Sequence, residues 1–207
     1  MSGNCAVFCG GDPVSERVFR EEYTAGCYNI AADSGYLLAK KLGVKSDIII
    51  GDFDSANRPD SENVIVFPVE KDDTDLMLAI KEGISRGYDR FLIFGATGGR
   101  LDHTYAAIQS LAYLLEHGAF GTVISENERI ELYKAGRYEF PKKEGMSMSL
   151  FAYSGSVGGL TVSGTKYVCE STELSAAFPL GVSNEVKAEK AVVSFEKGLL
   201  LVIRSKL

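Results

Sequence analysis

The chain has 207 residues and a formal net charge of −6 at pH 7, with 45% hydrophobic and 24% charged residues. This length suits one large domain or two small ones, and the composition is that of an ordinary globular protein. The acidic balance argues against nucleic acid as the main partner, because nucleic-acid-binding proteins usually carry a basic face. The apolar run Leu199 to Ile203 is far shorter than the roughly 20 residues of a membrane helix, so we expect no membrane span.

The N-terminus and the cysteines favour a cytoplasmic protein. Residues 1–4 have neither the basic segment nor the long apolar segment of a secretory signal. Cys5, Cys9, Cys27 and Cys169 form no C-x-x-C pair. Scattered cysteines in a chain of this size are typical of reduced thiols rather than of a disulfide framework or a zinc site.

The first part of the chain alternates short apolar runs with helical patterns. The runs predict strands at Cys5–Cys9, Tyr28–Ala32, Asp47–Ile50, Val64–Phe67, Arg90–Phe94 and Thr122–Ser125. Most of them are continuous rather than alternating, which is typical of parallel strands covered on both faces. Apolar spacing predicts helices over 75–86, capped by side chains of Asp72 to Asp75, and over 101–115, with Gly118 at its C-terminal end. We expect a doubly wound, mostly parallel α/β sheet.

The second part has a different character, because no Asp follows Asp102 and Gly, Ser and Thr divide short apolar runs. The runs predict strands at Arg129–Lys134, Ser147–Tyr153, Gly159–Ser163, Glu185–Ala188, Ala191–Glu196 and Leu199–Ile203. We expect a small β-sandwich. The predicted organisation is therefore an α/β domain over residues 1–126 followed by a β-sandwich domain over residues 127–207.

Acidic residues are concentrated between residues 47 and 75, where seven Asp and two Glu face one Arg and one Lys. Asp52 and Asp54 follow a predicted strand, at the edge of the sheet where α/β proteins bind ligands. Side chains at positions i and i+2 of an extended segment share a face, and Mg²⁺ accepts such carboxylates together with phosphates. Lys71-Asp72-Asp73-Thr74-Asp75 follows the next strand. Taken alone, the first motif fits a metal site or a turn, and the second fits a shared acidic site or a helix cap.

A glycine-rich segment, Gly95-Ala-Thr-Gly-Gly-Arg100, leads from a predicted strand into a predicted helix. Glycines let the backbone approach a ligand, N–H groups at a helix start favour anions, and Arg100 can add bidentate contacts. The segment therefore favours phosphate binding over a simple tight turn. Two other polar turns, around Asp33 and around Ser183 and Asn184, fit either capping and turn roles or a site.

These motifs together resemble the thiamine pyrophosphokinase family, bacterial type. The resemblance rests on Ala32-Asp-Ser-Gly35, Ile50-Gly-Asp-Phe-Asp-Ser55, Lys71-Asp-Asp-Thr-Asp75, Gly98-Gly-Arg-Leu-Asp-His103, Gly164-Thr-Lys-Tyr167 and Ser183-Asn-Glu185. It implies an ATP-binding α/β domain, a C-terminal β-sandwich, and a homodimer with thiamine at the subunit interface. The implied reaction converts ATP and thiamine into AMP and thiamine diphosphate.

The resemblance also implies a role for each motif residue. Asp52, Asp54 and Asp75 would hold Mg²⁺, and Asp102 and Arg100 would join them in catalysis. The residues implied along ATP are Asp33, Ser34, Lys71, Asp73, Thr97, Gly98, Gly99 and Arg100. The residues implied at thiamine are Asp102, His103, Ser183 and Asn184. Either Asp102 or Asp73 could accept the proton of the thiamine hydroxyl.

Three alternatives stay open from the sequence. A related diphosphokinase could act on another heterocyclic alcohol, such as a pterin. A D-x-D phosphatase would use the first Asp of its motif as a nucleophile. A nucleotide sensor would bind ATP and Mg²⁺ without turnover.

Overall fold

The computed structural model describes residues 3–53, 63–66, 68 and 72–207. The chain divides into two compact units, residues 1–126 (unit 1) and residues 127–207 (unit 2). No helix in the described part of the chain has the length and apolar character needed to cross a membrane.

Unit 1 is built on a parallel sheet. In the described residues its strands are β1 (Asn4–Phe8), β2 (Tyr28–Ala32), β3 (Ile48–Gly51), β4 (Val64–Val66), β5 (Arg90–Phe94) and β6 (Phe120–Ile124). They lie in the order β4-β3-β2-β1-β5-β6, and each neighbouring pair is parallel. The chain thus grows outward from β1 to β4 and then returns to the other side of β1. This reversal is the topological switch point of a doubly wound sheet.

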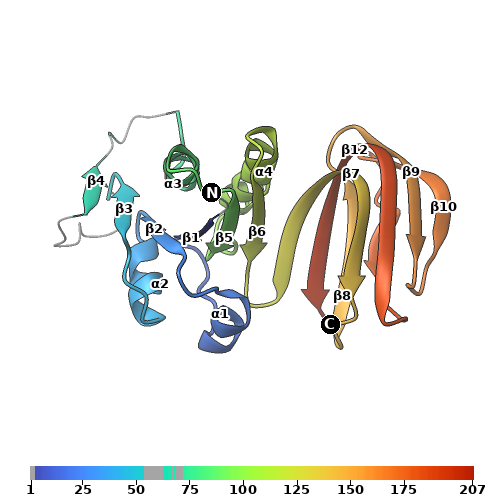
Figure 1. Cartoon of the computed structure of the whole chain (residues 1–207), viewed down its shortest axis with the longest axis horizontal. Coiled ribbons are helices and arrows are strands. Elements are labelled where there is room, and N and C mark those ends of the chain that lie inside the picture. The colour runs from blue at the N-terminus through green and yellow to red at the C-terminus, as the bar shows by residue number, and fades with distance from the viewer. Residues whose placement is uncertain (1–2, 54–62, 67, 69–71) are drawn as a thin grey trace. The chain divides into compact units, whose positions relative to one another are not determined.

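Helices cover both faces of this sheet (Figure 1). They are α1 (Glu16–Glu22), α2 (Gly35–Lys41), α3 (Asp75–Ser85) and α4 (Leu101–Glu116) in the described residues. Figure 1 shows α1 and α2 on one face and α3 and α4 on the other. Ala6 and Phe8 of β1 pack in one core cluster with Phe19 of α1 and Leu38 of α2. Because both faces are covered, the strands are continuous apolar runs, and the predicted doubly wound sheet is confirmed.

The ends of the two long helices follow from local chemistry. Thr74 is the N-cap of α3, and its Oγ1 accepts a hydrogen bond from the Met77 N–H at 3.2 Å. Thr74 lies within the segment Asp72 to Asp75 that was predicted to cap this helix, and the capping group is its hydroxyl. The α4 helix ends at Glu116, and Gly118 has a φ of +75°, the left-handed geometry that glycine supplies after a helix.

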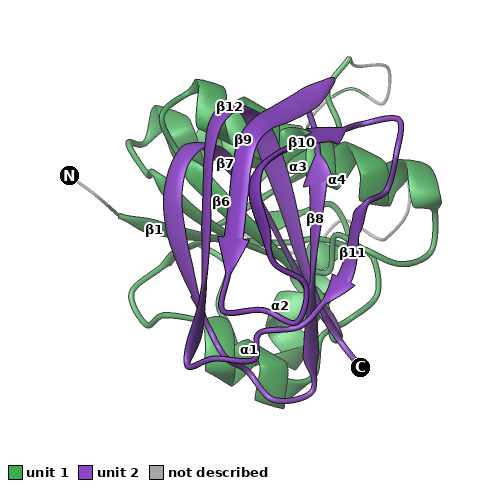
Figure 2. Cartoon of the chain, turned by 90° about the vertical axis from the view of Figure 1, so that its right-hand side faces the viewer, with its two compact units in different colours: residues 1–126 green, residues 127–207 purple. Residues whose placement is uncertain are grey.

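Unit 2 is an antiparallel β structure, drawn in purple in Figure 2. Its strands in the described residues are β7 (Glu128–Pro141), β8 (Met146–Ala152), β9 (Ser156–Ser163), β10 (Cys169–Ser175), β11 (Gly181–Asn184) and β12 (Lys190–Lys206). The first half of β12 pairs with β7 and β9, and its second half pairs with β7 and β8. The change of partner falls at a register shift between Phe195 and Leu199. Two sheets therefore share the long strands β7 and β12.

The core of unit 2 lies between the inner faces of these sheets. Val193 and Phe195 come from the first half of β12, and Leu200 and Val202 come from the second half. They form one buried cluster with Leu160 of β9 and other residues. Side chains from both sheets thus fill one interior, as expected for a β-sandwich.

Several strand predictions in unit 2 need correction. The segments Ala191–Glu196 and Leu199–Ile203 are one strand, β12, rather than two. Glu185–Ala188 is not a strand, and Val186 makes only an isolated bridge to Thr165. The strands β10 and β11 were not predicted, because both are short and mostly exposed, so neither has a continuous apolar run.

A buried ionic cluster lies on the inner side of β7 and β12. Glu131, with 6% of its side chain exposed, accepts a hydrogen bond from Arg204 Nη2 at 2.8 Å and one from the Tyr133 hydroxyl at 3.0 Å. Arg129 lies 3.7 Å from the same carboxylate. In the register, Glu131 is opposite the core residue Val202. The carboxylate thus neutralises guanidinium groups that the fold removes from water.

Candidate active site

The described site residues of unit 1 lie at or after the carboxyl ends of its strands, and β1 and β5 flank the switch point at this edge of the sheet. Backbone hydrogen bonds continue beyond these strands and join the two following loops. The N–H of Cys9 donates to Phe94 O at 2.9 Å, that of Gly11 to Gly95 O at 2.8 Å, and that of Asp12 to Thr97 O at 2.8 Å. Ligands of open α/β sheets bind outside this edge, so we expect the loops at this edge to form the binding site.

Three carboxylates converge at this edge. Asp33 follows β2, Asp52 follows β3, and Asp75 is the first residue of α3. One carboxylate oxygen from each lies within 4.8 Å of the other two, and all three residues are half-buried. The structure thus brings together two of the predicted metal ligands, Asp52 and Asp75, with Asp33, which was expected along the nucleotide. Asp54, the other predicted ligand, lies outside the described residues.

The close approach of β2 and β3 explains this convergence. The N–H of Asp33 donates to Ile50 O at 2.7 Å, and Asp33 has a φ of +47°. A Cβ atom on Gly51 would lie 2.9 Å from the Cα of Asp33, closer than side chains come in practice. Glycine at this position therefore lets the two strand ends meet. The residue after Asp52, Phe53, also has a positive φ, of +58°.

The charge of this cluster suits a divalent cation. Three carboxylates at this spacing repel one another unless a cation lies between them. The buried Oδ1 of Asp33 has no hydrogen-bond partner in the described structure, which is costly for an anionic oxygen. Carboxylate oxygens are the hard ligands that Mg²⁺ takes together with phosphates and water. The residues present therefore fit a magnesium ion.

The acidic segment before α3 is held by a lysine. Lys81 Nζ donates to both carboxylate oxygens of Asp73, at 2.8 Å and 2.6 Å. Asp73 directly precedes the cap Thr74 and stands two residues before Asp75. Lys71, predicted near ATP, lies outside the described residues. The sequence reasoning missed Lys81, although its position two turns into the helix could have suggested a contact with the acidic N-terminal segment.

The glycine-rich segment ends in an exposed ion pair at the start of α4. Thr97 is buried, whereas Gly98 and Gly99 are exposed. Arg100 donates to both oxygens of Asp102, from Nε at 3.1 Å and from Nη2 at 2.5 Å. The hydrogen bonds from Arg100 hold the pKa of Asp102 below its usual value, and the hydrogen bond from Asp102 raises the pKa of Arg100. Both groups are therefore charged at neutral pH.

Two other predicted residues of unit 1 lie beside these groups in the chain. Ser34 directly follows Asp33 and is the half-buried N-cap residue of α2, without a side-chain capping bond. A Cβ on Gly10 would lie 1.9 Å from Ser34 Oγ, so this hydroxyl lies against the loop after β1. His103 is exposed in the first turn of α4.

In unit 2, the two predicted thiamine residues belong to β11. Ser183 is exposed with a φ of +57°, and its N–H donates to Ser149 Oγ at 3.0 Å. Asn184 is buried. Its Oδ1 accepts from Tyr167 N at 3.0 Å and from Glu185 N at 2.9 Å, and its Nδ2 donates to Tyr167 O at 2.7 Å. Asn184 thus holds the loop around Tyr167, and its direct contact with a ligand stays a prediction.

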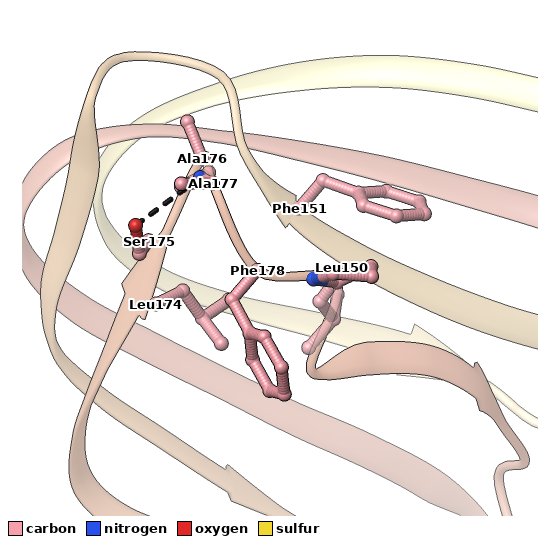
Figure 3. Close-up of a pocket in the computed structure, with 9 residues that line it drawn as sticks. Leu150, Phe151, Leu174, Ser175, Ala176, Ala177 and Phe178 are labelled. Carbon is pink, nitrogen blue, oxygen red and sulfur yellow. Dashed lines mark hydrogen bonds between the residues drawn. The ribbon is translucent and has the colours of Figure 1, made fainter.

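A small pocket lies elsewhere in unit 2, beside Phe178 (Figure 3). Its volume is about 90 Å³, and its walls come from β8 and from the segment that ends β10 and continues to Pro179. Sites for drug-sized ligands measure about 300–1,000 Å³, so this pocket is too small for a heterocyclic substrate. No predicted site residue lines it.

Comparisons with known proteins agree across both units. The family description "Thiamin pyrophosphokinase, catalytic domain" matches residues 19–120, and "Thiamin pyrophosphokinase, vitamin B1 binding domain" matches residues 137–200. A curated relative, the thiamine pyrophosphokinase of Bacillus subtilis, is 30% identical over 184 residues, which cover 85% of this chain and 86% of the relative.

Solved structures are also similar to this chain along its full length. The crystal structure of thiamine pyrophosphokinase from Bacillus subtilis has a TM-score of 0.90 at 26% identity and covers 99% of each chain. A thiamin pyrophosphokinase family protein from Enterococcus faecalis has a TM-score of 0.82 at 28% identity and covers 100% of each chain. The Candida albicans enzyme, at 17% identity and a TM-score of 0.81, shares the fold and covers 99% of this chain and 90% of its own. Because the family matches span both units, this chain belongs to the thiamin pyrophosphokinase family of ATP-dependent pyrophosphoryl transferases.

Proposed function

We propose that this protein transfers the pyrophosphoryl group of ATP to the hydroxyl of thiamine, giving thiamine diphosphate and AMP. The observation that carries the proposal is the convergence of Asp33, Asp52 and Asp75 beside the joined loops after β1 and β5, in a chain of this family. The alcohol oxygen would attack the β-phosphorus of ATP, and AMP would leave. Such a transfer depends on positioning and on neutralising the charge of the phosphates.

The phosphates of ATP would be neutralised by a metal ion, by an arginine and by backbone N–H groups. Asp33, Asp52 and Asp75 would hold Mg²⁺, which when bound neutralises phosphate charge. Arg100 is exposed and would turn from Asp102 to the phosphates, together with backbone N–H groups of the segment 97–99. Asp54 and Lys71 keep the roles that the family resemblance implies.

The departure of Arg100 would also set the role of Asp102. While the pair is intact, the pKa of Asp102 is lowered, and its carboxylate accepts a proton poorly. When the guanidinium binds phosphate instead, the pKa of Asp102 rises and its carboxylate becomes a better base. Both oxygens of Asp73 are instead bound by Lys81, in the segment that leads into α3. We therefore assign the proton acceptor to Asp102, with His103 beside it at the thiamine end.

We further propose that the protein acts as a homodimer in the cytoplasm. Phe178, Leu180 and Val182 expose 65%, 58% and 45% of their surface along and just before β11. Contiguous apolar groups of this kind mark protein interfaces more often than free surface. Ser183 directly follows Val182 in β11, which supports a thiamine site completed by a second subunit. The four cysteines are free in the described structure, as expected in a reducing compartment.

The test is a direct assay. The purified protein is incubated with ATP, Mg²⁺ and thiamine, and AMP and thiamine diphosphate are followed by chromatography. Equal formation of both products, absent without thiamine or Mg²⁺, supports the proposal. Phosphate release without thiamine would indicate a phosphatase, product formation only with a pterin alcohol would indicate a related diphosphokinase, and ATP binding without turnover would indicate a sensor.

A matched pair of variants tests the metal assignment. Asp75→Asn should keep the fold and lose most turnover. Asp47→Asn is the control, since Asp47 accepts a hydrogen bond from the Asn29 N–H just before β3, at the opposite end of that strand from Asp52. Near-normal turnover of Asp75→Asn at saturating Mg²⁺ would contradict the assignment.

The shared thiamine site has its own test. Mixing inactive Asp75→Asn with inactive Ser183→Trp subunits should restore part of the activity, because one of the two sites in each mixed dimer is then intact. Sedimentation of the unchanged protein as a monomer at assay concentration would contradict the dimer.

A further inference from the structure

The ion pair between Asp73 and Lys81 joins three parts of unit 1 around the start of α3. Lys81 Nζ contacts both oxygens of Asp73, in the segment that precedes the helix cap. Lys81 itself lies two turns into α3, and side chains on a helix lean toward its N-terminus, so its ammonium reaches back to that segment. The ammonium also lies 5.9 Å from the centroid of the Tyr113 ring, which comes from α4.

The surroundings limit where this lysine can move. The Tyr113 ring stacks on His117 with centroids 4.0 Å apart, and His117 Nδ1 lies 2.8 Å from Tyr113 O. The ring is thus fixed at the end of α4 and forms one wall beside the ammonium. Lys81 and Asp73 are 42% and 31% exposed, so the pair lies at the surface but is not extended into solvent.

From this geometry we propose that Lys81 is a positioning residue for the metal site. By holding both oxygens of Asp73, it fixes the segment 73–74, and so it presents Asp75 to Asp33 and Asp52. Lys81 thus acts on the carboxylate cluster through Asp73. The inference rests on the proposed magnesium site and adds to it a residue outside the sequence motifs.

Positioning and simple electrostatics predict opposite results, which makes the proposal testable. Lys81 carries a positive charge near a site that attracts cations. If the lysine acted only through its charge, its removal would strengthen cation binding. If it positions Asp75, its removal will weaken cation binding, because the three carboxylates no longer converge. Partners that orient metal ligands typically change metal affinity about 10- to 100-fold.

The experiment measures Mn²⁺ binding to the whole protein by electron paramagnetic resonance, with neither ATP nor thiamine present. We expect Lys81→Met to weaken Mn²⁺ binding about 10-fold. Lys81→Arg should restore most of the affinity, because a guanidinium can also bind both oxygens of Asp73. Lys40→Met removes the same charge from an exposed position in the last turn of α2, and it should leave the affinity unchanged.

A double-mutant cycle shows whether Lys81 acts through Asp73. In the Asp73→Asn background, Lys81→Met should have little further effect, since the pair is already broken. In the activity assay, Lys81→Met should need about 10-fold more Mg²⁺ and keep its kcat at saturating Mg²⁺. Loss of folding would lower kcat at every Mg²⁺ concentration.

The outcomes separate this inference from the proposed function. Equal or tighter Mn²⁺ binding by Lys81→Met would overturn the positioning role. An absence of Mn²⁺ binding by the unchanged protein would overturn the metal site and the inference together. If Lys81→Met weakens Mn²⁺ binding while the unchanged protein makes no thiamine diphosphate, the inference stands and the proposed reaction fails.

Discussion

Replacement of Asp33 by Asn should raise the stability of the protein in the absence of metal. It should also reduce the stability that the protein gains when metal binds. The Asp33 carboxylate lies within 4.8 Å of both Asp52 and Asp75. At that distance two unit charges repel by about 0.9 kcal/mol in water and by about 3.5 kcal/mol at an effective dielectric constant of about 20. Asp33→Asn removes two such repulsions. Because the three residues are only half-buried, we take the lower limit, a gain of about 2 kcal/mol.

The substitution is suited to this purpose because it changes little else. Asn has the shape of Asp and tolerates a positive φ, so the value of +47° adds no strain. The backbone hydrogen bond from residue 33 to Ile50 O is kept. The substitution also removes the charge from an oxygen that is buried without a partner.

Thermal unfolding measures both parts of this prediction. In EDTA, Asp33→Asn should raise the unfolding temperature of unit 1 by about 4–8 °C, since a chain of this size gains about 2–4 °C per kcal/mol. With Mg²⁺, the unchanged protein should gain stability by mass action, and the variant should gain much less. Asp47→Asn, the control outside the cluster, should not raise the unfolding temperature. A lower unfolding temperature of Asp33→Asn in EDTA, or an undiminished response to Mg²⁺, would refute the reasoning.

Three further predictions concern other parts of the molecule. Glu131→Gln leaves buried guanidinium groups uncompensated and should lower the unfolding free energy of unit 2 by about 3 kcal/mol. Glu139→Gln breaks an exposed ion pair and should lower it by less than about 1 kcal/mol. Urea unfolding measures both changes. Burial raises the pKa of Cys9 to about 12, so the folded state favours the neutral thiol. Iodoacetamide at pH 8 should therefore alkylate Cys9 only after unfolding, as read by mass spectrometry, and the contribution of Cys9 to the unfolding free energy should fall as the pH rises from about 9 to about 12. Gly51→Ala places a Cβ 2.9 Å from the Cα of Asp33 and should abolish the stabilisation by Mg²⁺ in thermal unfolding, whereas an unchanged response would show that the strand ends can separate without loss of the site.

The sheet of unit 1 could be predicted because most of its strands are buried on both faces and read as continuous apolar runs, although β4 is partly exposed. The strand Tyr28–Ala32 was predicted with the bounds that the structure has. The same reasoning missed β10, because Leu174 is its one buried side chain among the described residues and Ser171 interrupts it with a φ of +47°. An edge strand of this kind is held by backbone pairing to one neighbour, which leaves no pattern in the sequence.

The sequence predicted the chemistry of the candidate site, a metal ion held by carboxylates, but it did not predict all of the residues that form the site. Asp52 was predicted as a metal ligand because its motif directly follows a predicted strand and can be recognised within a few residues of sequence. The carboxylate of Asp33 joins it across two strands, and that contact depends on the approach allowed by Gly51. Lys81 illustrates the same limit, since its bond to Asp73 requires knowing which way the side chain leans along α3.

The pairing of β7 with β12 has a consequence for biosynthesis. These are the first and last strands of unit 2, and β12 contacts β7, β8 and β9. During translation unit 2 thus lacks its central strand until the final residues of β12 leave the ribosome, whereas every strand of the unit 1 sheet is already available. Contacts between segments distant in sequence also slow folding. We expect a growing chain to carry a folded unit 1 and an unfolded unit 2, so a stop codon before β12 would leave the sandwich without its shared strand.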